Sequence, residues 1–301
     1  MALTPSIANV QIAGIADWKI KLTQDGLYRS LSSFRKGLLE IKPLATKDSY
    51  QRDIQYGYDL SASGEFLAVG TAAHFADLLG TIGTSDVSHK IQLLNGQYIN
   101  SGATSMSPAT FGVKWKMISD KDMDDALYCQ FSASRRLTPT SMGYIYASNT
   151  TNPADGNNSN DILQTLAPVI GDIVPAGIVK VELGATAGLG DVVSNLRNGK
   201  FTAELLTTPD VRGQEHGYAV KIDFEGEGME TTAAELIVWG TIAARANYIK
   251  LTFAGGSTFT SAASMGITTT VSSVKDSDDI MTIKIAGGGI ILPAAFTTAW
   301  S

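Results

Sequence analysis

Three aspartates at alternate positions form the first candidate site for chemistry in this sequence. Asp120, Asp122 and Asp124 have the spacing of the first three ligands of a calcium-binding loop. An EF-hand also requires glycine at its sixth position and glutamate at its twelfth, where this chain has Asp125 and Phe131. The segment therefore favours a solvated turn between two strands, and a weak calcium site is the alternative.

A second acidic segment repeats this pattern later in the chain. Lys121–Asp125 and Lys275–Asp279 share the sequence Lys-Asp-x-Asp-Asp, and Val274 takes the place of Asp120 in the second copy. The loop Asp276–Asp279 therefore has the same two interpretations, a solvated turn or a weak calcium site.

The residues that most often act as nucleophiles or metal ligands are few and scattered. His74, His89 and His216 match no metal-ligand spacing, and we expect His74 to be a partly buried structural histidine on a helix. The single cysteine, Cys129, lies in the strand-like stretch Leu127–Phe131, which favours a packing role. We therefore expect no catalytic residue, metal or cofactor.

Glycine-rich segments are the remaining candidates for a phosphate site. Gly226-Glu-Gly228 lacks the third glycine of a dinucleotide fingerprint, and the chain has no Walker loop. Gly287–Gly289 follows a strand, but neither a helix nor a lysine follows it, which favours a flexible turn.

The overall composition excludes several classes of function. The chain has 301 residues and a mass of 31.8 kDa, enough for a large core in one or two domains. Its formal net charge is −6, so tight binding of nucleic acid is not expected. The first residues, Met1–Leu22, lack the pattern of a signal peptide, and no apolar segment is long enough to span a membrane as a helix. We therefore expect a soluble protein made in the cytoplasm.

The two halves of the chain resemble each other. Four pairs of segments match in chain order: Gly37–Asp48 with Gly199–Asp210, Tyr56–Tyr58 with His216–Tyr218, Gly80–Ile82 with Gly240–Ile242, and Lys121–Asp125 with Lys275–Asp279. The separation decreases along the chain, from 162 residues (37 to 199) to 154 (121 to 275). Collinear matches of this kind predict an internal duplication with small deletions in the second copy.

A polar segment separates the two predicted copies. In Ser148–Asp161, Ala154 is the only apolar residue, and such a segment buries too little surface to fold. The sequence therefore predicts a first β domain at 1–147, a linker at 148–161 and a second β domain at 162–301.

Alternation of apolar and polar residues predicts strands in both halves. It is clearest in Trp18–Leu22, Val179–Leu183, Ile222–Glu225 and Met281–Ile285. One segment per half, Thr71–Gly80 and Thr231–Gly240, instead begins with threonine and ends with glycine, which predicts a short helix. The expected fold class is mainly β with a minor α component (α+β): two tandem homologous β-sandwich or barrel domains, each with one short helix.

A duplicated β unit without a chemical site favours a role in assembly. Two tandem copies can occupy equivalent positions in a closed ring, so that three chains form a pseudo-hexamer. The layout of the first half resembles the tail tube (major tail) proteins of long-tailed bacteriophages. It consists of Gly37–Thr46, a polar loop, Tyr56–Phe66, a short helix and paired strands. The second half repeats this layout. The resemblance implies a tail-tube-like fold, a place in the virion tail after synthesis in the bacterial cytoplasm, and no enzymatic activity.

In that family, neighbouring subunits join their sheets around a lumen and a long loop reaches the adjacent ring. The resemblance implies that Thr46–Tyr56 and Thr208–His216 are such inter-ring contact loops, the second two residues shorter; an ordinary exposed hairpin loop is the alternative. The charged residues implied to make these contacts are Lys47, Asp48, Arg52, Asp53, Asp210, Arg212 and Glu215.

The partners implied are further copies of the chain in stacked homotrimeric rings, other tail proteins, and genomic DNA that passes without specific binding; no membrane is implied. The net negative charge suits a lumen that repels phosphate. The alternatives are another virion protein (capsid decoration, collar or head–tail connector), an Ig-like adhesion module, or a carbohydrate-active enzyme. The last would need a pair of carboxylates that flank the bond, and no pair stands out.

Overall fold

The three-dimensional structure is a computed structural model, and most of the residues that it describes lie in β-strands. The described residues are 15–22, 28–31, 34–84, 87–93, 98–100, 111–120, 126–137, 146–147, 161–162, 174–186, 189–192, 196–210, 214–229, 248–261, 263–273 and 281–301. They include two helices, α1 (Ala72–Thr84) and α4 (Pro293–Thr298). The prediction of a mainly β fold is therefore confirmed.

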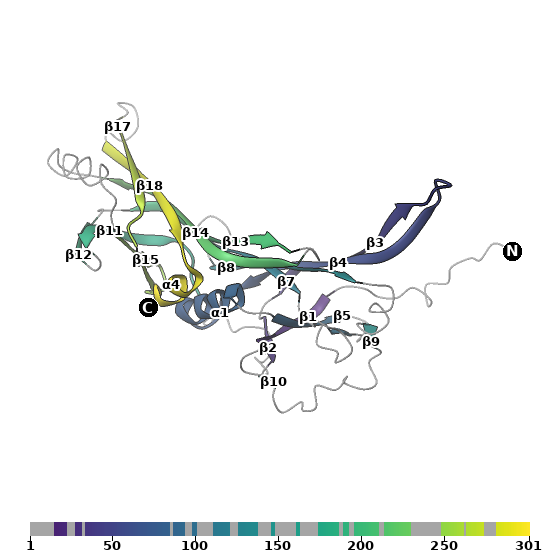
Figure 1. The fold of residues 1–301 in the computed structure, drawn as a ribbon. Coiled ribbons are helices and arrows are strands. Elements are labelled where there is room, and N and C mark those ends of the chain that lie inside the picture. The colour runs from purple at the N-terminus through teal and green to yellow at the C-terminus, as the bar shows by residue number, and fades with distance from the viewer. Residues whose placement is uncertain are drawn as a thin grey trace.

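An antiparallel sheet of twelve strands dominates the structure, and eight of its strands form one continuous path (Figure 1). In spatial order these eight are β3 (Arg35–Lys47), β4 (Asp53–Leu67), β8 (Tyr128–Leu137), β7 (Gly112–Asp120), β13 (Arg197–Pro209), β14 (Glu215–Met229), β18 (Met281–Ile291) and β17 (Gly266–Ser273). We call this path the long sheet. Figure 1 shows β3 and β17 at its opposite ends.

The other strands form smaller layers. One residue pair, Ile178 with Gly199, joins β13 of the long sheet to β11 (Ile178–Thr186). β11 in turn pairs with β12 (Leu189–Val192) and β15 (Tyr248–Phe253), and β15 pairs with β16 (Thr258–Thr260). A separate six-stranded sheet has the order β10 (Asp161–Ile162), β2 (Tyr28–Ser30), β1 (Ile15–Leu22), β5 (Val87–Leu93), β6 (Tyr98–Asn100) and β9 (Tyr146–Ala147). Figure 1 shows β1, β2, β5, α1 and α4 on one side of the long sheet.

Aromatic side chains fill the core on this covered side. Trp18, Phe66 and Phe131 pack edge to face beneath the first half of the long sheet. Phe201 and Trp300 belong to a second cluster beneath β13, together with Phe253, Phe259 and Phe296. Alternation in strands such as β14 places every second residue in the core and the others on the opposite face.

The β3–β4 and β13–β14 hairpins repeat one hydrogen-bond register. The bounds of β13 and β14 are those of β3 and β4 shifted by 162 residues (35 to 197, 53 to 215). Both register shifts recur at that separation: Leu44/Ala45 corresponds to Leu206/Thr207, and Arg35/Leu38 corresponds to Arg197/Lys200. The strand order β3-β4-β8-β7 is likewise repeated as β13-β14-β18-β17.

This register corrects the predicted difference between the two hairpin loops. The turns run from Lys47 to Asp53 and from Pro209 to Glu215, so the second is not two residues shorter. Tyr56 corresponds to Tyr218 rather than to His216, and both tyrosines are more than half exposed (57% and 54%). The Tyr-Gly-Tyr and His-Gly-Tyr segments are similar in sequence but do not occupy equivalent positions. The strand register determines which residues of the two hairpins are equivalent.

Two expectations about glycine were also wrong. Helix α1 does not end at Gly80 but continues to Thr84, although Thr71 caps its start by accepting a hydrogen bond from the His74 amide at 3.2 Å. A side chain on Gly80 would collide with Thr297 of α4, so this glycine permits close packing of two helices. Gly287–Gly289 lie inside β18 rather than in a turn. Glycine is required at position 287 because a Cβ there would come within 2.7 Å of the Phe224 ring.

The two predicted domains share the long sheet, because β7 of the first half pairs with β13 of the second. Asp161, at the end of the predicted linker, pairs with Tyr28 of the first half. The helix predicted at 231–240 lies outside the described residues. Within the described part of the chain, neither helix is long and apolar enough to cross a membrane.

Candidate assembly interface

The outer strands of the long sheet have one hydrogen-bonded neighbour each among the described residues. β3 pairs with β4, and β17 pairs with β18. Edge strands are commonly protected from further pairing by lysine, proline or bulges, and β3 has Lys42, Pro43 and two register shifts. β17 has the sequence Gly-Ile-Thr-Thr-Thr-Val-Ser-Ser, which contains no charge and no proline. Within the described part of the chain, the outer side of β17 thus has no strand partner and none of these protective features.

The face of the long sheet opposite the core is polar, and we call it the open face. Exposed side chains project from it at alternate positions of several strands: Lys114, Gln130, Arg136, Glu204, Lys221, Asp223, Glu225, Thr268, Thr270 and Lys284. A shallow hollow of about 380 Å³ on this face is lined by Lys200, Asp223 and Glu225 among others. Both signs of charge meet there, so the hollow provides no single-sign field for a charged ligand.

Ion pairs balance much of the charge on the open face. Lys42 lies 2.8 Å from Glu40, and the hydrogen bond and charge of Glu40 raise the pKa of Lys42. Lys221 lies 2.8 Å from Asp223, which raises the pKa of Lys221 in the same way. These exposed pairs add little stability, but they make the open face a mosaic of both charges.

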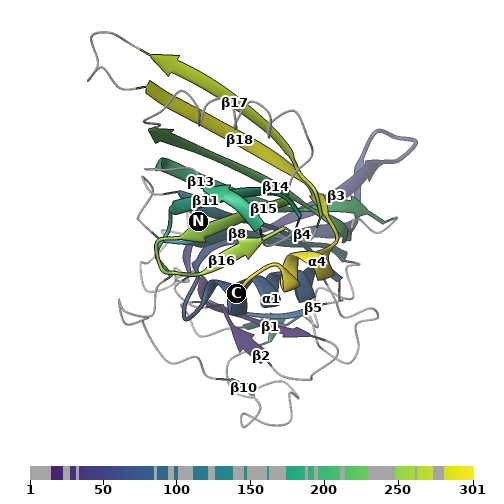
Figure 2. The same cartoon turned by 90° about the vertical axis from the view of Figure 1, so that its left-hand side faces the viewer.

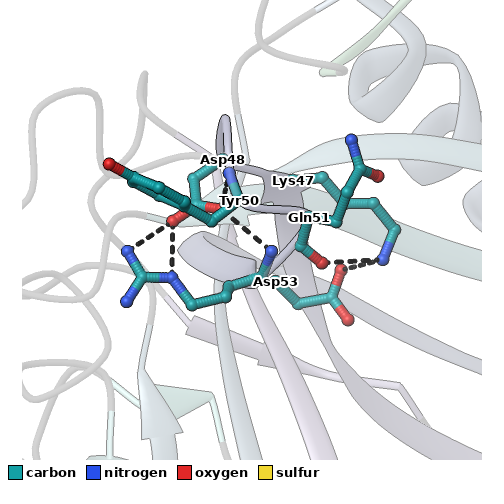
Figure 3. Close-up of polar contacts among 6 residues, drawn as sticks. Lys47, Asp48, Tyr50, Gln51 and Asp53 are labelled. Atoms are coloured by element: carbon teal, nitrogen blue, oxygen red, sulfur yellow. Dashed lines mark hydrogen bonds and ion pairs between the residues drawn. The ribbon is translucent and has the colours of Figure 1, made fainter.

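Lys47, Asp48, Arg52 and Asp53, four of the predicted contact residues, lie together at the turn between β3 and β4; Figure 3 shows Lys47, Asp48 and Asp53 there. Asp48 accepts hydrogen bonds from the amides of Tyr50 and Arg52 at 2.8 and 2.9 Å, and it pairs with the Arg52 guanidinium at 2.7 Å. The Arg52 amide, followed by that guanidinium, holds the pKa of Asp48 below its usual value. Lys47 and Asp53 form a second pair at 3.3 Å. The turn is thus held by its own charges and presents Tyr50, which is 78% exposed.

The second turn is built in the same way but contacts the first half of the chain. Asp210 accepts a hydrogen bond from the Gln214 amide at 2.8 Å, and Arg212 lies outside the described residues. Glu215 pairs with Lys114 of β7 at 2.8 Å and accepts a hydrogen bond from Thr207 at 2.7 Å. Partial burial pushes the pKa of Glu215 upward, but Lys114 and Thr207 outweigh it and hold the pKa below its usual value.

The pairing of β7 with β13 joins the two halves, and we call it the internal joint. Its ladder runs from Lys116 opposite Glu204 to Asp120 opposite Lys200, and the first pair is also an ion pair at 3.3 Å. Gly112, at the start of β7, lies directly under the second turn, because a Cβ there would overlap the Glu215 amide nitrogen. The internal joint therefore combines a β ladder, a glycine contact and two ion pairs.

The histidine and the cysteine inside the fold have structural positions. His89 is fully buried, its Nδ1 accepts a hydrogen bond from the Trp18 indole at 3.0 Å, and burial lowers its pKa to about 3. Cys129 is buried in β8, and burial raises the pKa of its thiol, so it lacks the thiolate needed for reactivity. His74, expected to be partly buried, is exposed on α1.

The acidic segments 121–125 and 274–280 lie outside the described residues, so their two interpretations stay predictions. Within the part of the chain that the structure does describe, no group of three or more His, Cys, Asp or Glu side chains could hold a metal ion. No protein-family model matches the chain, and no curated protein matches its sequence.

Proposed function

We propose that this chain is a structural subunit of a bacteriophage tail tube, in which three copies form a ring and rings stack around a channel for DNA. One observation carries this proposal: the block β3-β4-β8-β7 recurs as β13-β14-β18-β17 in a single sheet, whose two outer strands lie at opposite ends and lack an outer partner among the described strands (Figure 2). A repeated block that ends on two different edges suits head-to-tail association, which gives a ring when the rotation between copies closes. The repeat also supports the proposed duplication.

The open face supports the same function. A channel wall for DNA must be hydrated and must bind phosphate weakly, and the open face combines charged, ion-paired and hydroxyl side chains. The opposite face is covered by helices and smaller sheets (Figure 1), so the open face is the one that can border a channel. Such a subunit acts without catalysis, cofactor or membrane, and its place is in the virion tail.

Negative-stain electron microscopy of the purified full chain tests this function. We expect rings with a central hole, and hollow tubes at high protein concentration. Isolated compact particles at every concentration would contradict the tube and would favour a capsid decoration protein or another virion component instead.

A further inference from the structure

We propose that β17 of one copy pairs with β3 of the next copy in the register of the internal joint, and that Gly266 is a glycine because the neighbour's β3–β4 turn packs on it. The inference rests on the proposed ring assembly and adds to it the residues that meet. It follows from comparing the internal joint with β3 and β17, the two outer strands that have no second partner among the described strands.

The register follows from the repeated strands. β17 corresponds to β7 at a separation of 154 residues (112 to 266), and β3 corresponds to β13 at 162. In the internal joint Lys116 lies opposite Glu204. The same pairing between two copies places Thr270 opposite the neighbour's Lys42. Two residues further along β17, it places Ser272 opposite the neighbour's Glu40.

The surroundings of Gly266 support the same register independently of the strand alignment. Its counterpart Gly112 is buried and has no room for a Cβ, because the Glu215 backbone lies against it. A Cβ on Gly266 would meet only the Gly288 oxygen, at 3.8 Å, and Gly266 is exposed. Nothing within the described chain requires glycine at this position. The residue that corresponds to Glu215 is Asp53, so the neighbour's Asp53 backbone would occupy the space above Gly266.

The exposure of the two turns agrees with a missing neighbour. The Glu215 side chain is 14% exposed against β7, whereas the Asp53 side chain is 71% exposed. Gln214 is buried, whereas its counterpart Arg52 is exposed. The β3–β4 turn therefore projects into solvent where the β13–β14 turn is packed on the first half of the chain.

The two joints differ in chemistry. The internal joint has ion pairs from Lys114 and Lys116 of β7, and their counterparts in β17 are Thr268 and Thr270. Contacts between copies would thus join hydroxyl groups to the neighbour's charged residues. The two joints are not equivalent on the covered side of the sheet. Gly217 of β14 lies close to α1, whereas the corresponding residue of β4 is Gln55.

Two glycine variants test the steric contact. Sedimentation velocity of Gly266→Ala should show loss of assembly at concentrations where the wild-type chain forms rings, with an unchanged thermal unfolding temperature. Gly289→Ala, in β18 of the same sheet, is the matched control. Its added Cβ would make an ordinary 3.4 Å contact with Met265, so this variant should assemble normally. Normal assembly of Gly266→Ala would overturn the proposed contact.

A pair of introduced cysteines tests the register. We expect Thr270→Cys combined with Lys42→Cys to form disulfides between chains on oxidation, while Thr270→Cys with Glu40→Cys, whose partners are diagonal neighbours about 7–8 Å apart, should form few. Rings without the first cross-link would overturn the register and leave the tube function standing. Cross-linked open filaments without rings would support the register and contradict the tube. Monomers alone would overturn both.

Discussion

At the residue scale, the buried His89 makes folding sensitive to acid. The imidazole accepts a hydrogen bond from Trp18 and stacks on Phe111, with ring centroids 5.4 Å apart, and its complete burial favours the neutral form. Its pKa of about 3 in the folded chain is far below the value near 6.5 of an exposed histidine. Below pH 6.5 the unfolded chain therefore binds a proton that the folded chain does not.

This difference predicts that the free energy of unfolding falls as pH decreases from about 6.5 towards 3, by up to about 1.4 kcal/mol per pH unit. Urea unfolding at several pH values measures it. The His89→Ile variant should lose this contribution, and His74→Gln, at an exposed position, should keep it. Parallel pH profiles for the wild-type chain and His89→Ile would show that His89 is not responsible.

Local pattern was sufficient to predict some features and insufficient for others. Alternation located much of β1 and β11 and the first part of β18 because one face of each strand must be buried, and Thr71 identified the start of α1 through its capping oxygen. Gly80 and Gly287–Gly289 misled because their lack of a side chain serves contacts with distant residues, Thr297 and Phe224. Helix α4 was missed, since it has only six residues.

The predicted contact residues show the same limit. The resemblance implied a contact loop at Thr46–Tyr56, yet nothing local distinguishes its turn from the turn before Glu215, which packs on β7. The difference depends on which strand lies beside each hairpin, and that is a property of the whole sheet. The position of β17 at the outer edge of the sheet was missed for the same reason.

At the element scale, the internal joint is the contact on which the shape of the subunit depends. The β13–β14 turn rests on the start of β7, where Gly112 leaves room for the backbone of Glu215. The Lys114–Glu215 pair lies over the same place, at 2.8 Å. If this contact fails, the two halves of the long sheet lose part of their alignment.

A substitution at the internal joint should therefore destabilise the folded chain itself. We expect Gly112→Ala to lower the free energy of unfolding by about 1–3 kcal/mol, because the new Cβ forces the turn away from β7. Chemical unfolding of the isolated subunit measures this loss, with Gly289→Ala as the control. Equal stability of Gly112→Ala and the wild-type chain would refute the steric role of Gly112, whereas Gly266→Ala should change assembly alone.

At the scale of the whole molecule, the outer strands β3 and β17 lie at opposite ends of one long sheet, and the open face lies between them (Figures 1 and 2). Two different edges that pair with each other give a heterologous contact, which can close only as a ring or continue as a filament. With two repeated blocks in each chain, a ring of three chains would have six similar blocks around its channel.

Native mass spectrometry of the assembled wild-type chain tests this central claim most directly. The proposed ring predicts a discrete species of three times the 31.8 kDa chain, together with its multiples as rings stack. A species that stops at two chains would indicate a symmetric pairing of like surfaces, and a chain that stays monomeric at high concentration would leave both edges unused. Either result would contradict the head-to-tail ring.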